Sequence, residues 1–407
     1  MNLPEVLVDP SIRARLAAGH PWVYRNHVSR EPARVTNGSW VRVRCGGFSA
    51  IGLWDTSSPI ALRIFSASTV PDAEWVAERV WEAWDGRASL REAGQTNAYR
   101  WLYGEGDGLP GMVVDRYGDY AIMQTYAPSL QTLVPLVATA LRRCDPDLRG
   151  LVLRERPDHE VTDPDEERDA DPAAPAPRLR LLWGELPPPD LVVQEHGLFF
   201  HADLHQGQKT GLFLDHRENR RMIEALAGGR SVLNCFAYTG GFSLYALRGG
   251  AAEVISNDLG KGLAEAASAN LALNRLDPRR HQFVTDDSFS LLDSYARTGR
   301  RFQLIILDPP SFARQKRNLH AATRAYTRLN ALALRCLEPG GLLATASCTS
   351  QISPELFRNL LTDAATQAGV RLLISHEVGQ PVDHPVPVAF PEGRYLKFIL
   401  ARSLPRV

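Results

Sequence analysis

The sequence predicts an α/β protein with a Rossmann-like, doubly wound sheet in its C-terminal half. A β-rich N-terminal domain and a central α+β domain precede that half. Short alternating strand patterns fill the first 70 or so residues, and strands mixed with two helical stretches follow. From Leu191 onward, strand candidates alternate with helices over about 200 residues, which is typical of a mostly parallel sheet. We expect domains at residues 1–72, 73–192 and 193–407.

The N-terminal domain reads as a small β-barrel-like module with a net basic charge. "SWVRVRCGGFSAIGLWD" alternates around Gly46 and Gly47, a pattern that predicts a hairpin, and "ALRIFSA" predicts a further strand. Two interpretations remain open for its aromatic side chains, which could stack on nucleic-acid bases or fill a small core. These aromatic residues are Trp22, Tyr24, Trp40 and Trp54.

The central domain begins with apolar residues at helical spacing from Pro71 to Arg91. "YRWLYGEGDGLPGMVVDRYGDYAIMQTY" then predicts three strands joined by turns. A helix near 129–142 and a strand at 150–154 complete the domain. Residues 157–178 are acidic and rich in Pro and Ala, which predicts a disordered or solvated loop. Because 155–171 contains nine acidic residues and two arginines, the rest of this formally neutral chain is net basic.

The C-terminal half supplies the sheet and its helices. Strands are predicted at 232–233, 253–256, 282–284, 303–307, 342–346 and 371–375, and helices at 243–248, 262–274, 324–337 and 354–368. In doubly wound sheets, ligands bind outside the carboxyl ends of the strands. The unusual residues of this half lie at those predicted ends.

The first of these ends has the pattern of a nucleoside-cofactor site. In "VLNCFAYTGGFSLYAL", a strand, a small-residue turn and a helix follow one another, and Gly240 and Gly241 permit close backbone approach. Asp258 follows the second strand, where a carboxylate could accept hydrogen bonds from the ribose hydroxyls, and Asp287 follows the third. The turn lacks the G-x-G-x-x-G spacing that binds pyrophosphate, which favours S-adenosylmethionine. Alternatively, the glycines form turns and the aspartates cap helices.

The fourth and fifth strand ends predict the chemistry. "LIILDPPSFAR" places Asp308 before Pro309 and Pro310, and Cys348 follows the fifth strand, where we expect solvent and ligands to reach its thiol. A thiolate can add to C6 of cytosine and activate C5 for methylation. A rival interpretation uses D-P-P to methylate an exocyclic amine, although Ser311 separates the prolines from Phe312. A third treats Cys348 as inert packing.

Basic residues cluster after this motif, at positions that could contact phosphates or form a solvated helix face. They are Arg314, Lys316, Arg317, Arg324 and Arg328.

Other classes of protein are disfavoured. No apolar run approaches the ~20 residues that cross a bilayer, and an N-terminus with Pro4, Glu5 and Asp9 is unlike a signal peptide, so we expect a cytoplasmic protein without membrane association. The five cysteines show no C-x-x-C spacing, which argues against a zinc site and a disulfide framework, and no metal is expected.

These motifs resemble the bacterial class I S-adenosylmethionine-dependent 23S ribosomal RNA cytosine-C5 methyltransferases. "HPWVYRNHV" resembles the family's PUA (RNA-binding) module, "GEGDGLPGMVVDRYG" its central domain, and "HQGQKTGLFLDHRENR" the hairpin that leads into its catalytic domain. "VLNCFAYTGGFS", "LDPPSFA", "SCTS" and "DHPVPVAFPEGRYLK" match later motifs, so the likeness covers almost the whole chain. The acidic loop and the Asn257-Asp258-Leu259 strand end depart from the family pattern.

The resemblance implies a role for each matching residue. Cys348 would be the nucleophile, and Asp308 would support the base and approach the cofactor. The other cofactor-binding residues would be Asn234, Phe236, Ala237, Tyr238, Thr239, Gly240, Gly241, Asp258 and Asp287. The substrate-binding residues would be Pro309, Pro310, Phe312, Arg314, Lys316 and Arg317.

The resemblance also implies 23S ribosomal RNA or an assembly intermediate as the substrate, and a possible homodimer. A non-catalytic RNA-binding assembly factor that kept the fold is the remaining alternative.

Overall fold

The computed structural model describes residues 3–31, 34–155, 178–312 and 318–406. The acidic loop, apart from Arg178, and the basic residues Arg314, Lys316 and Arg317 lie outside these ranges. The chain forms two compact units. Unit 1 comprises Met1–Val193, Ala202–Leu214 and Val382–Gly393, and unit 2 comprises Gln194–His201, Asp215–Pro381 and Arg394–Val407. The boundaries predicted at residues 72 and 192 stay predictions.

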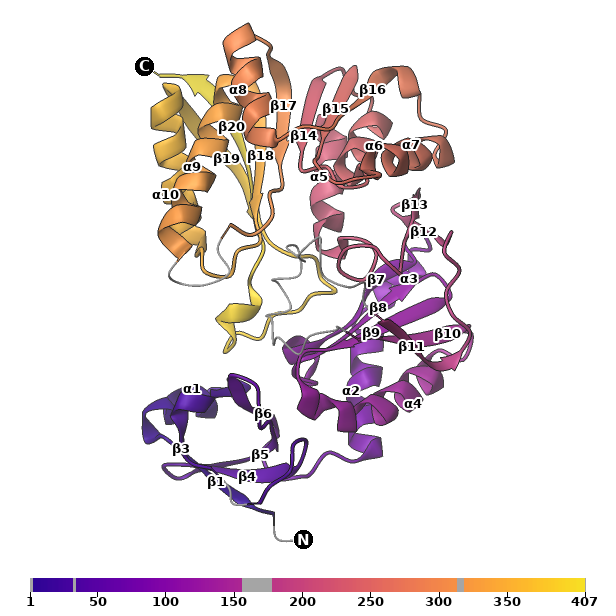
Figure 1. The fold of residues 1–407 in the computed structure, drawn as a ribbon, viewed down its shortest axis with the longest axis vertical. Coiled ribbons are helices and arrows are strands. Elements are labelled where there is room, and N and C mark those ends of the chain that lie inside the picture. Colours follow the sequence, from indigo (N-terminus) through magenta and orange to yellow (C-terminus); the bar gives the residue numbers. More distant parts are fainter. Residues whose placement is uncertain (1–2, 32–33, 156–177, 313–317, 407) are drawn as a thin grey trace. The chain divides into compact units, whose positions relative to one another are not determined.

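The N-terminal part of unit 1 is a six-stranded sheet in the order β2-β6-β5-β4-β1-β3 (Figure 1). Its elements are β1 (Glu5–Val8), α1 (Arg13–Ala17), β2 (Trp22–Tyr24), β3 (Val28–Arg30), β4 (Trp40–Cys45), β5 (Phe48–Trp54) and β6 (Ile60–Ser66). The predicted hairpin is confirmed, because Cys45 pairs with Phe48 across Gly46 and Gly47, whose φ angles are 48° and 85°. Two left-handed residues in a two-residue loop match the twist of the strands. Trp54 is buried among valines and leucines, as core packing requires.

The central part of unit 1 is a five-stranded sheet in the order β11-β10-β9-β8-β7. Its elements are α2 (Ala73–Asp85), α3 (Ala88–Glu92), β7 (Ala98–Tyr103), β8 (Met112–Tyr117), β9 (Tyr120–Thr125), α4 (Val134–Cys144), β10 (Gly150–Glu155) and β11 (Arg178–Gly184). The Asp72 carboxylate caps α2 by accepting the Trp75 N–H at 2.9 Å. The helix predicted over 71–91 is divided after Gly86, because Arg87 turns its guanidinium inward to the carbonyls of Ala83 and Arg100.

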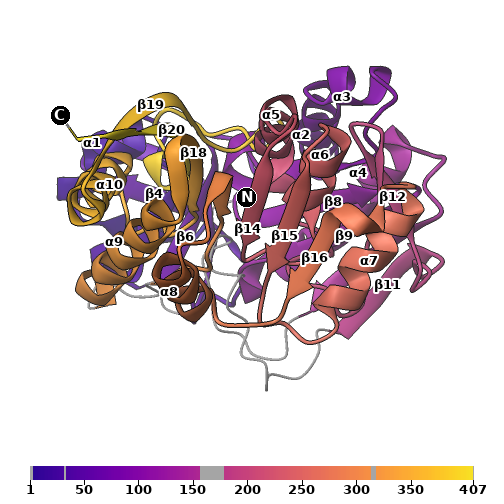
Figure 2. The same ribbon diagram turned by 90° about the horizontal axis from the view of Figure 1, so that it is seen from above.

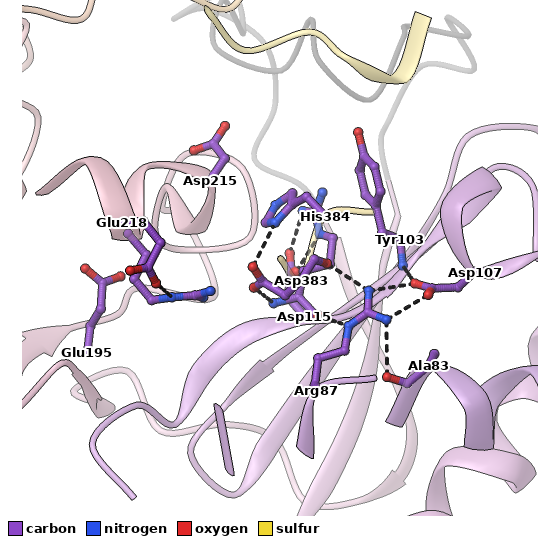
Figure 3. A network of polar contacts seen from close by, with 12 residues as sticks. Ala83, Arg87, Tyr103, Asp107, Asp115, Glu195, Asp215, Glu218, Asp383 and His384 are labelled. Atoms are coloured by element: carbon purple, nitrogen blue, oxygen red, sulfur yellow. Dashed lines mark hydrogen bonds and ion pairs between the residues drawn. The ribbon is translucent and has the colours of Figure 1, made fainter. Parts of the chain in front are cut away.

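Buried ion pairs fix the interior of unit 1 (Figure 3). Arg87 donates two hydrogen bonds of 2.7 Å to the Asp107 carboxylate, which also accepts the Tyr103 N–H at 2.6 Å. Arg87 donates another, of 2.8 Å, to the Asp383 carbonyl. Since burying a charge is costly without a well-aligned partner, these paired geometries specify how the segment around Asp383 packs.

A second pair anchors the other late segment of unit 1. Arg100 donates to both oxygens of Asp115 at 2.8 and 3.0 Å, and the Thr210 hydroxyl donates to Asp115 at 2.7 Å. The Arg100 N–H binds the Asp383 carboxylate at 2.9 Å. Segments 202–214 and 382–393, which follow the central domain in sequence, are therefore held by polar groups of its sheet and by Arg87.

We expect Arg87→Ala to lower the free energy of unfolding of unit 1 by about 3 to 5 kcal/mol, because it leaves the buried Asp107 carboxylate without its cation. All eight tryptophans, the last of them Trp183, belong to unit 1. Urea unfolding followed by tryptophan fluorescence therefore reports this unit. Arg143→Ala, which removes the exposed pair with Glu74, is the matched control and should cost less than about 1 kcal/mol. Equal losses in both variants would contradict the buried-pair argument.

Unit 2 is built on a seven-stranded sheet in the order β16-β15-β14-β17-β18-β20-β19, which can be followed from above in Figure 2. Its strands are β14 (Ser231–Cys235), β15 (Glu253–Asn257), β16 (His281–Val284), β17 (Phe302–Leu307), β18 (Leu337–Ser347), β19 (Val370–Val378) and β20 (Lys397–Pro405). Every predicted strand is present. β20 was not predicted, and it runs antiparallel between β18 and β19.

The helices of unit 2 cover both faces of this sheet. They are α5 (Arg217–Leu226), α6 (Gly241–Arg248), α7 (Leu263–Leu273), α8 (Ser288–Thr298), α9 (Leu319–Arg335) and α10 (Pro354–Ala368). Alternate residues of β14 face opposite ways, so Leu233 and Cys235 pack against α8, α9 and α10, while Asn234 faces α6. α5 and α8 were not predicted.

The hairpin expected at 205–220 is also placed differently. β12 (Val192–Glu195) and β13 (Leu198–His201) form the hairpin, whereas residues 205–220 run through turns into α5. Among the described residues, no helix has the length and apolar character needed to cross a membrane.

Candidate functional site

The loop between β14 and α6 has an unusual backbone. Phe236, Tyr238 and Gly240 adopt positive φ angles of 60°, 49° and 85°. Left-handed non-glycine residues are strained, and alternating left-handed residues turn successive N–H groups into a concave cradle. At Gly240 a Cβ would also lie 3.3 Å from Leu244 Cδ1. The cofactor prediction for 236–241 therefore falls on a loop whose shape is imposed by its surroundings.

Asp258, at the end of β15, holds this loop. One carboxylate oxygen accepts the Tyr238 N–H at 2.8 Å, and the other accepts the Gly260 N–H at 3.0 Å. The Asn257 carbonyl accepts the Ala237 N–H at 3.0 Å. Charge-assisted bonds to backbone amides offset the strain, so Asp258 shapes the cradle itself.

A buried polar chain lies beneath the loop. The Asn234 amide donates to Ser243 Oγ at 2.9 Å, Ser243 Oγ lies 2.7 Å from Ser256 Oγ, and Ser256 Oγ lies 2.7 Å from His281 Nε2. Asn234 is fully buried. The Asn234 side chain therefore belongs to this buried series of hydrogen bonds, and only the Asn234 backbone leads into the loop between β14 and α6.

Asn270 of α7 is a support that the sequence reasoning missed. Its amide donates to the Thr239 carbonyl of the loop at 3.1 Å, and its oxygen accepts the His201 N–H of β13 at 2.9 Å. The sequence signal that could have found it is a polar Asn within an apolar helical run, "SANLAL", and the structure buries this side chain fully.

Asp287 fits the capping alternative. Its carboxylate accepts the Ser290 N–H at 2.9 Å and caps α8, while Asp286 accepts the Asp287 N–H at 2.7 Å. The third strand end therefore brings its carboxylates to the predicted edge, but Asp287 uses one oxygen in the helix cap.

β17 and β18 bring the predicted catalytic residues to the same edge. Leu307 pairs with Thr345, so Asp308 and Cys348 follow the ends of adjacent parallel strands. The prediction that solvent reaches the thiol is wrong, because Cys348 is 1 % exposed.

The loop after β18 explains this burial. Thr349 Oγ1 lies 3.0 Å from Ser311 Oγ and 2.9 Å from the Tyr326 hydroxyl. These bonds tie the loop that follows Cys348 to the one that follows Asp308. The run of small polar residues after β18 predicts an open end of the sheet, whereas in the structure Thr349 of this run makes its hydrogen bonds within the fold.

A buried cation lies beside this loop. Lys397 pairs with Ser347 across β18 and β20, is 3 % exposed, and donates 2.6 Å bonds to the carbonyls of Thr349 and Tyr395. The sequence reasoning did not assign it a role, although it stands in a motif of the resemblance and is one of four lysines. A buried ammonium favours an anion nearby, such as a thiolate.

His216 was also missed. Its Nε2 lies 3.2 Å from Asp308 Oδ1, and the two side chains are 1 % and 12 % exposed. It comes from the turn that leads into α5, about 90 positions before Asp308 in sequence, so no local spacing signals the pair.

Phe312, predicted to contact substrate, is held by other aromatic rings. Its centroid lies 4.7 Å from that of Tyr326 and 6.1 Å from that of Phe289. Arg324 and Arg328 are exposed on α9. Within the described ranges, no group of three or more His, Cys, Asp or Glu side chains is arranged to hold a metal ion.

The buried polar chain gives a pH prediction. Burial lowers the pKa of His281 from 6.5 to about 4, so the folded state favours the neutral imidazole. As the pH falls from about 6.5 to about 4, the His281 imidazole becomes protonated in the unfolded state but stays neutral in the folded state. Unit 2 should lose about 3 kcal/mol of stability over this range through His281.

His281→Gln, which cannot titrate, should remove this part of the acid sensitivity. Urea unfolding followed by far-ultraviolet circular dichroism at both ends of the range measures it. The same acid loss in the variant as in the original protein would rule out His281 as its source.

Comparisons with known proteins agree with this geometry. A profile of the S-adenosylmethionine-dependent methyltransferase family matches residues 179–389, and a PUA-like domain profile matches residues 6–67. Ribosomal RNA large subunit methyltransferase I from Salmonella arizonae is 34% identical over 407 residues, covering 99% of this chain and 98% of its own length. The protein of that name from Tolumonas auensis is 36% identical over 390 residues, covering 95% and 96%.

Solved structures give the same fold. A proposed SAM-dependent methyltransferase from Streptococcus mutans matches with a TM-score of 0.84 at 22% identity, over 98% of this chain and 100% of that one. A methyltransferase structure complexed with S-adenosylhomocysteine matches with a TM-score of 0.85 at 22% identity and the same coverage. The predicted class I methyltransferase fold with an N-terminal PUA-like domain is confirmed.

Proposed function

We propose that this chain, which belongs to the family of ribosomal RNA large subunit methyltransferase I, transfers a methyl group to C5 of a cytosine in 23S ribosomal RNA. The family profile that matches this chain describes methyltransferases that depend on S-adenosylmethionine. The observation that carries the finer assignment is the pairing of β17 with β18, which puts Asp308 and Cys348 at adjacent strand ends.

The residues present fit the cofactor. The cradle at 236–241, the loop-holding carboxylate of Asp258 and the carboxyl end of β14 form one continuous edge of the sheet. They would hold S-adenosylmethionine, which supplies an electrophilic methyl group when bound. Strain stored in this loop favours a preformed site over one built on binding.

The proposed chemistry is covalent. The Cys348 thiolate adds to C6 of the cytosine, forming a C–S bond and making C5 nucleophilic. C5 would then accept the methyl group that bound S-adenosylmethionine supplies, with release of the demethylated cofactor. A base removes the C5 proton, and its electron pair restores the double bond and expels the thiolate. Asp308 would hold the protonated N3 during the addition.

The buried environment of Cys348 is consistent with this role in one respect. A thiol in an apolar interior resists ionisation, but the Lys397 ammonium donates to the carbonyl of Thr349, the residue after Cys348, and a buried cation beside this loop favours a thiolate. For the base to reach the thiol, the target nucleotide must leave its stack, so an unpaired segment of RNA is the expected substrate.

Methylation of an exocyclic amine is less well supported. That chemistry needs an aromatic ring next to D-P-P that can stack on the base, whereas Phe312 packs on Tyr326 and Phe289. The N-terminal module, 1–72, would bind RNA through backbone contacts while the sheet edge reads the base.

Cys348→Ala should abolish formation of 5-methylcytosine while leaving S-adenosylmethionine affinity within about threefold, because only the covalent step is removed. The assay uses deproteinised 23S ribosomal RNA and labelled cofactor, with nucleoside analysis of the product. Cys144→Ala, at a half-buried thiol in unit 1, is the control and should retain activity. Methylated adenine or guanine as the product, or full activity without Cys348, would overturn the assignment.

Asp258→Ala should weaken S-adenosylmethionine binding by at least about tenfold, because the strained loop loses its charge-assisted bond at the Tyr238 N–H and the site loses a carboxylate. Calorimetry measures this without any RNA. Asp277→Ala, which removes a capping carboxylate elsewhere in unit 2, is the matched control. Unchanged affinity in Asp258→Ala would remove this carboxylate from the cofactor site.

A further inference from the structure

We propose that His216 is a positioning residue that sets the orientation of the Asp308 carboxylate toward the target base. This inference rests on the proposed function. His216 Nε2 faces Asp308 Oδ1 at 3.2 Å, and the imidazole is buried while the carboxyl group keeps a small exposure. A contact at Oδ1 limits how the carboxyl group can turn.

The tautomer of His216 follows from its other contact. Asn219, one turn further along α5, places its amide nitrogen 3.0 Å from His216 Nδ1. An amide nitrogen can only donate, so Nδ1 accepts and the proton of the neutral ring is on Nε2. Nε2 is buried and, within the described part of the chain, makes no well-aligned hydrogen bond, while Asp308 Oδ1 lies within its reach at 3.2 Å.

The ring is also held in place by packing. Phe242 of α6 and Phe398 of β20 lie edge-on to it, with centroids 5.4 and 6.0 Å from the imidazole. Those two phenyl rings are parallel, with an interplanar angle of 5°. An imidazole between two fixed rings cannot rotate its Nε2 away from Asp308 without displacing one of them.

The preceding residue has a different partner. The Asp215 carboxylate accepts a 2.9 Å bond from the Tyr395 hydroxyl, which anchors the turn before α5 to the segment that enters β20. The turn that carries His216 is thus fixed at Asp215, at Asn219 and by the phenyl rings. These contacts together hold the imidazole beside the Asp308 carboxylate.

Glutamine and asparagine substitutions separate this role from packing. A Gln amide nitrogen reaches the position of Nε2, whereas an Asn amide reaches only that of Nδ1. We expect His216→Gln to keep kcat within about threefold of the original enzyme. His216→Asn should lower kcat by about 30-fold or more, since small misplacements of a catalytic group cost up to about 100-fold. Cofactor affinity should stay within about twofold in both.

The readout is covalent trapping on 23S ribosomal RNA that contains 5-fluorocytosine. Fluorine at C5 cannot leave as a cation, so the adduct with Cys348 accumulates, and its rate of formation reports the step that Asp308 assists. Trapping should be slowed in His216→Asn and restored in His216→Gln. His376→Asn, at an exposed histidine of β19, is the control and should trap at the original rate.

The outcomes separate the two proposals. Equal trapping rates in the Gln and Asn variants, whether both normal or both slow, would overturn the role of His216. If the original enzyme forms neither 5-methylcytosine nor a trapped adduct, the proposed function itself fails. Thermal unfolding of each variant identifies any loss that comes from misfolding.

Discussion

The parallel register of β14, β15, β17 and β18 is the constraint on which the candidate site depends. Residues far apart in sequence reach one edge because each strand is hydrogen-bonded to the next in a fixed alignment. A slip of one residue would turn every side chain to the opposite face. Leu233 and Cys235 would then leave the core, so burial of the α8–α9 face enforces the register that the chemistry requires.

Polar groups at that edge are satisfied by one another and by backbone. Asp258 holds two amides, Asn270 holds a carbonyl and an amide, and Thr349 joins the loops after β17 and β18. Networks of this kind are costly when incomplete and rigid when satisfied. The rigidity explains how a strained loop at 236–240 and a buried thiol at Cys348 can persist in one place.

Buried and satisfied polar groups also occur in unit 1, where they fix how segments of the chain pack. The guanidinium groups of Arg87 and Arg154 donate to carbonyls of segments that come later in the chain, and the Arg100 backbone N–H donates to the Asp383 carboxylate. Directional hydrogen bonds to buried groups make those segments adopt one packing, which apolar contacts alone do not specify as sharply. The PUA-like sheet of the same unit is instead stabilised by an apolar core, to which Trp54 and the valines of β4 belong.

Local signals determined much of this protein. α10 spans Pro354–Ala368, as predicted, because Ser353 caps its start and Gly369 ends it in a left-handed conformation, and the Gly46-Gly47 hairpin and the strand ends at Asp258 and Asp308 follow from equally local chemistry. Only the tertiary structure placed β20 between β18 and β19, buried Cys348, and brought His216 and Lys397 to the edge. Those positions depend on pairings between segments tens of residues apart, whose free energy comes from long-range packing that no local spacing records.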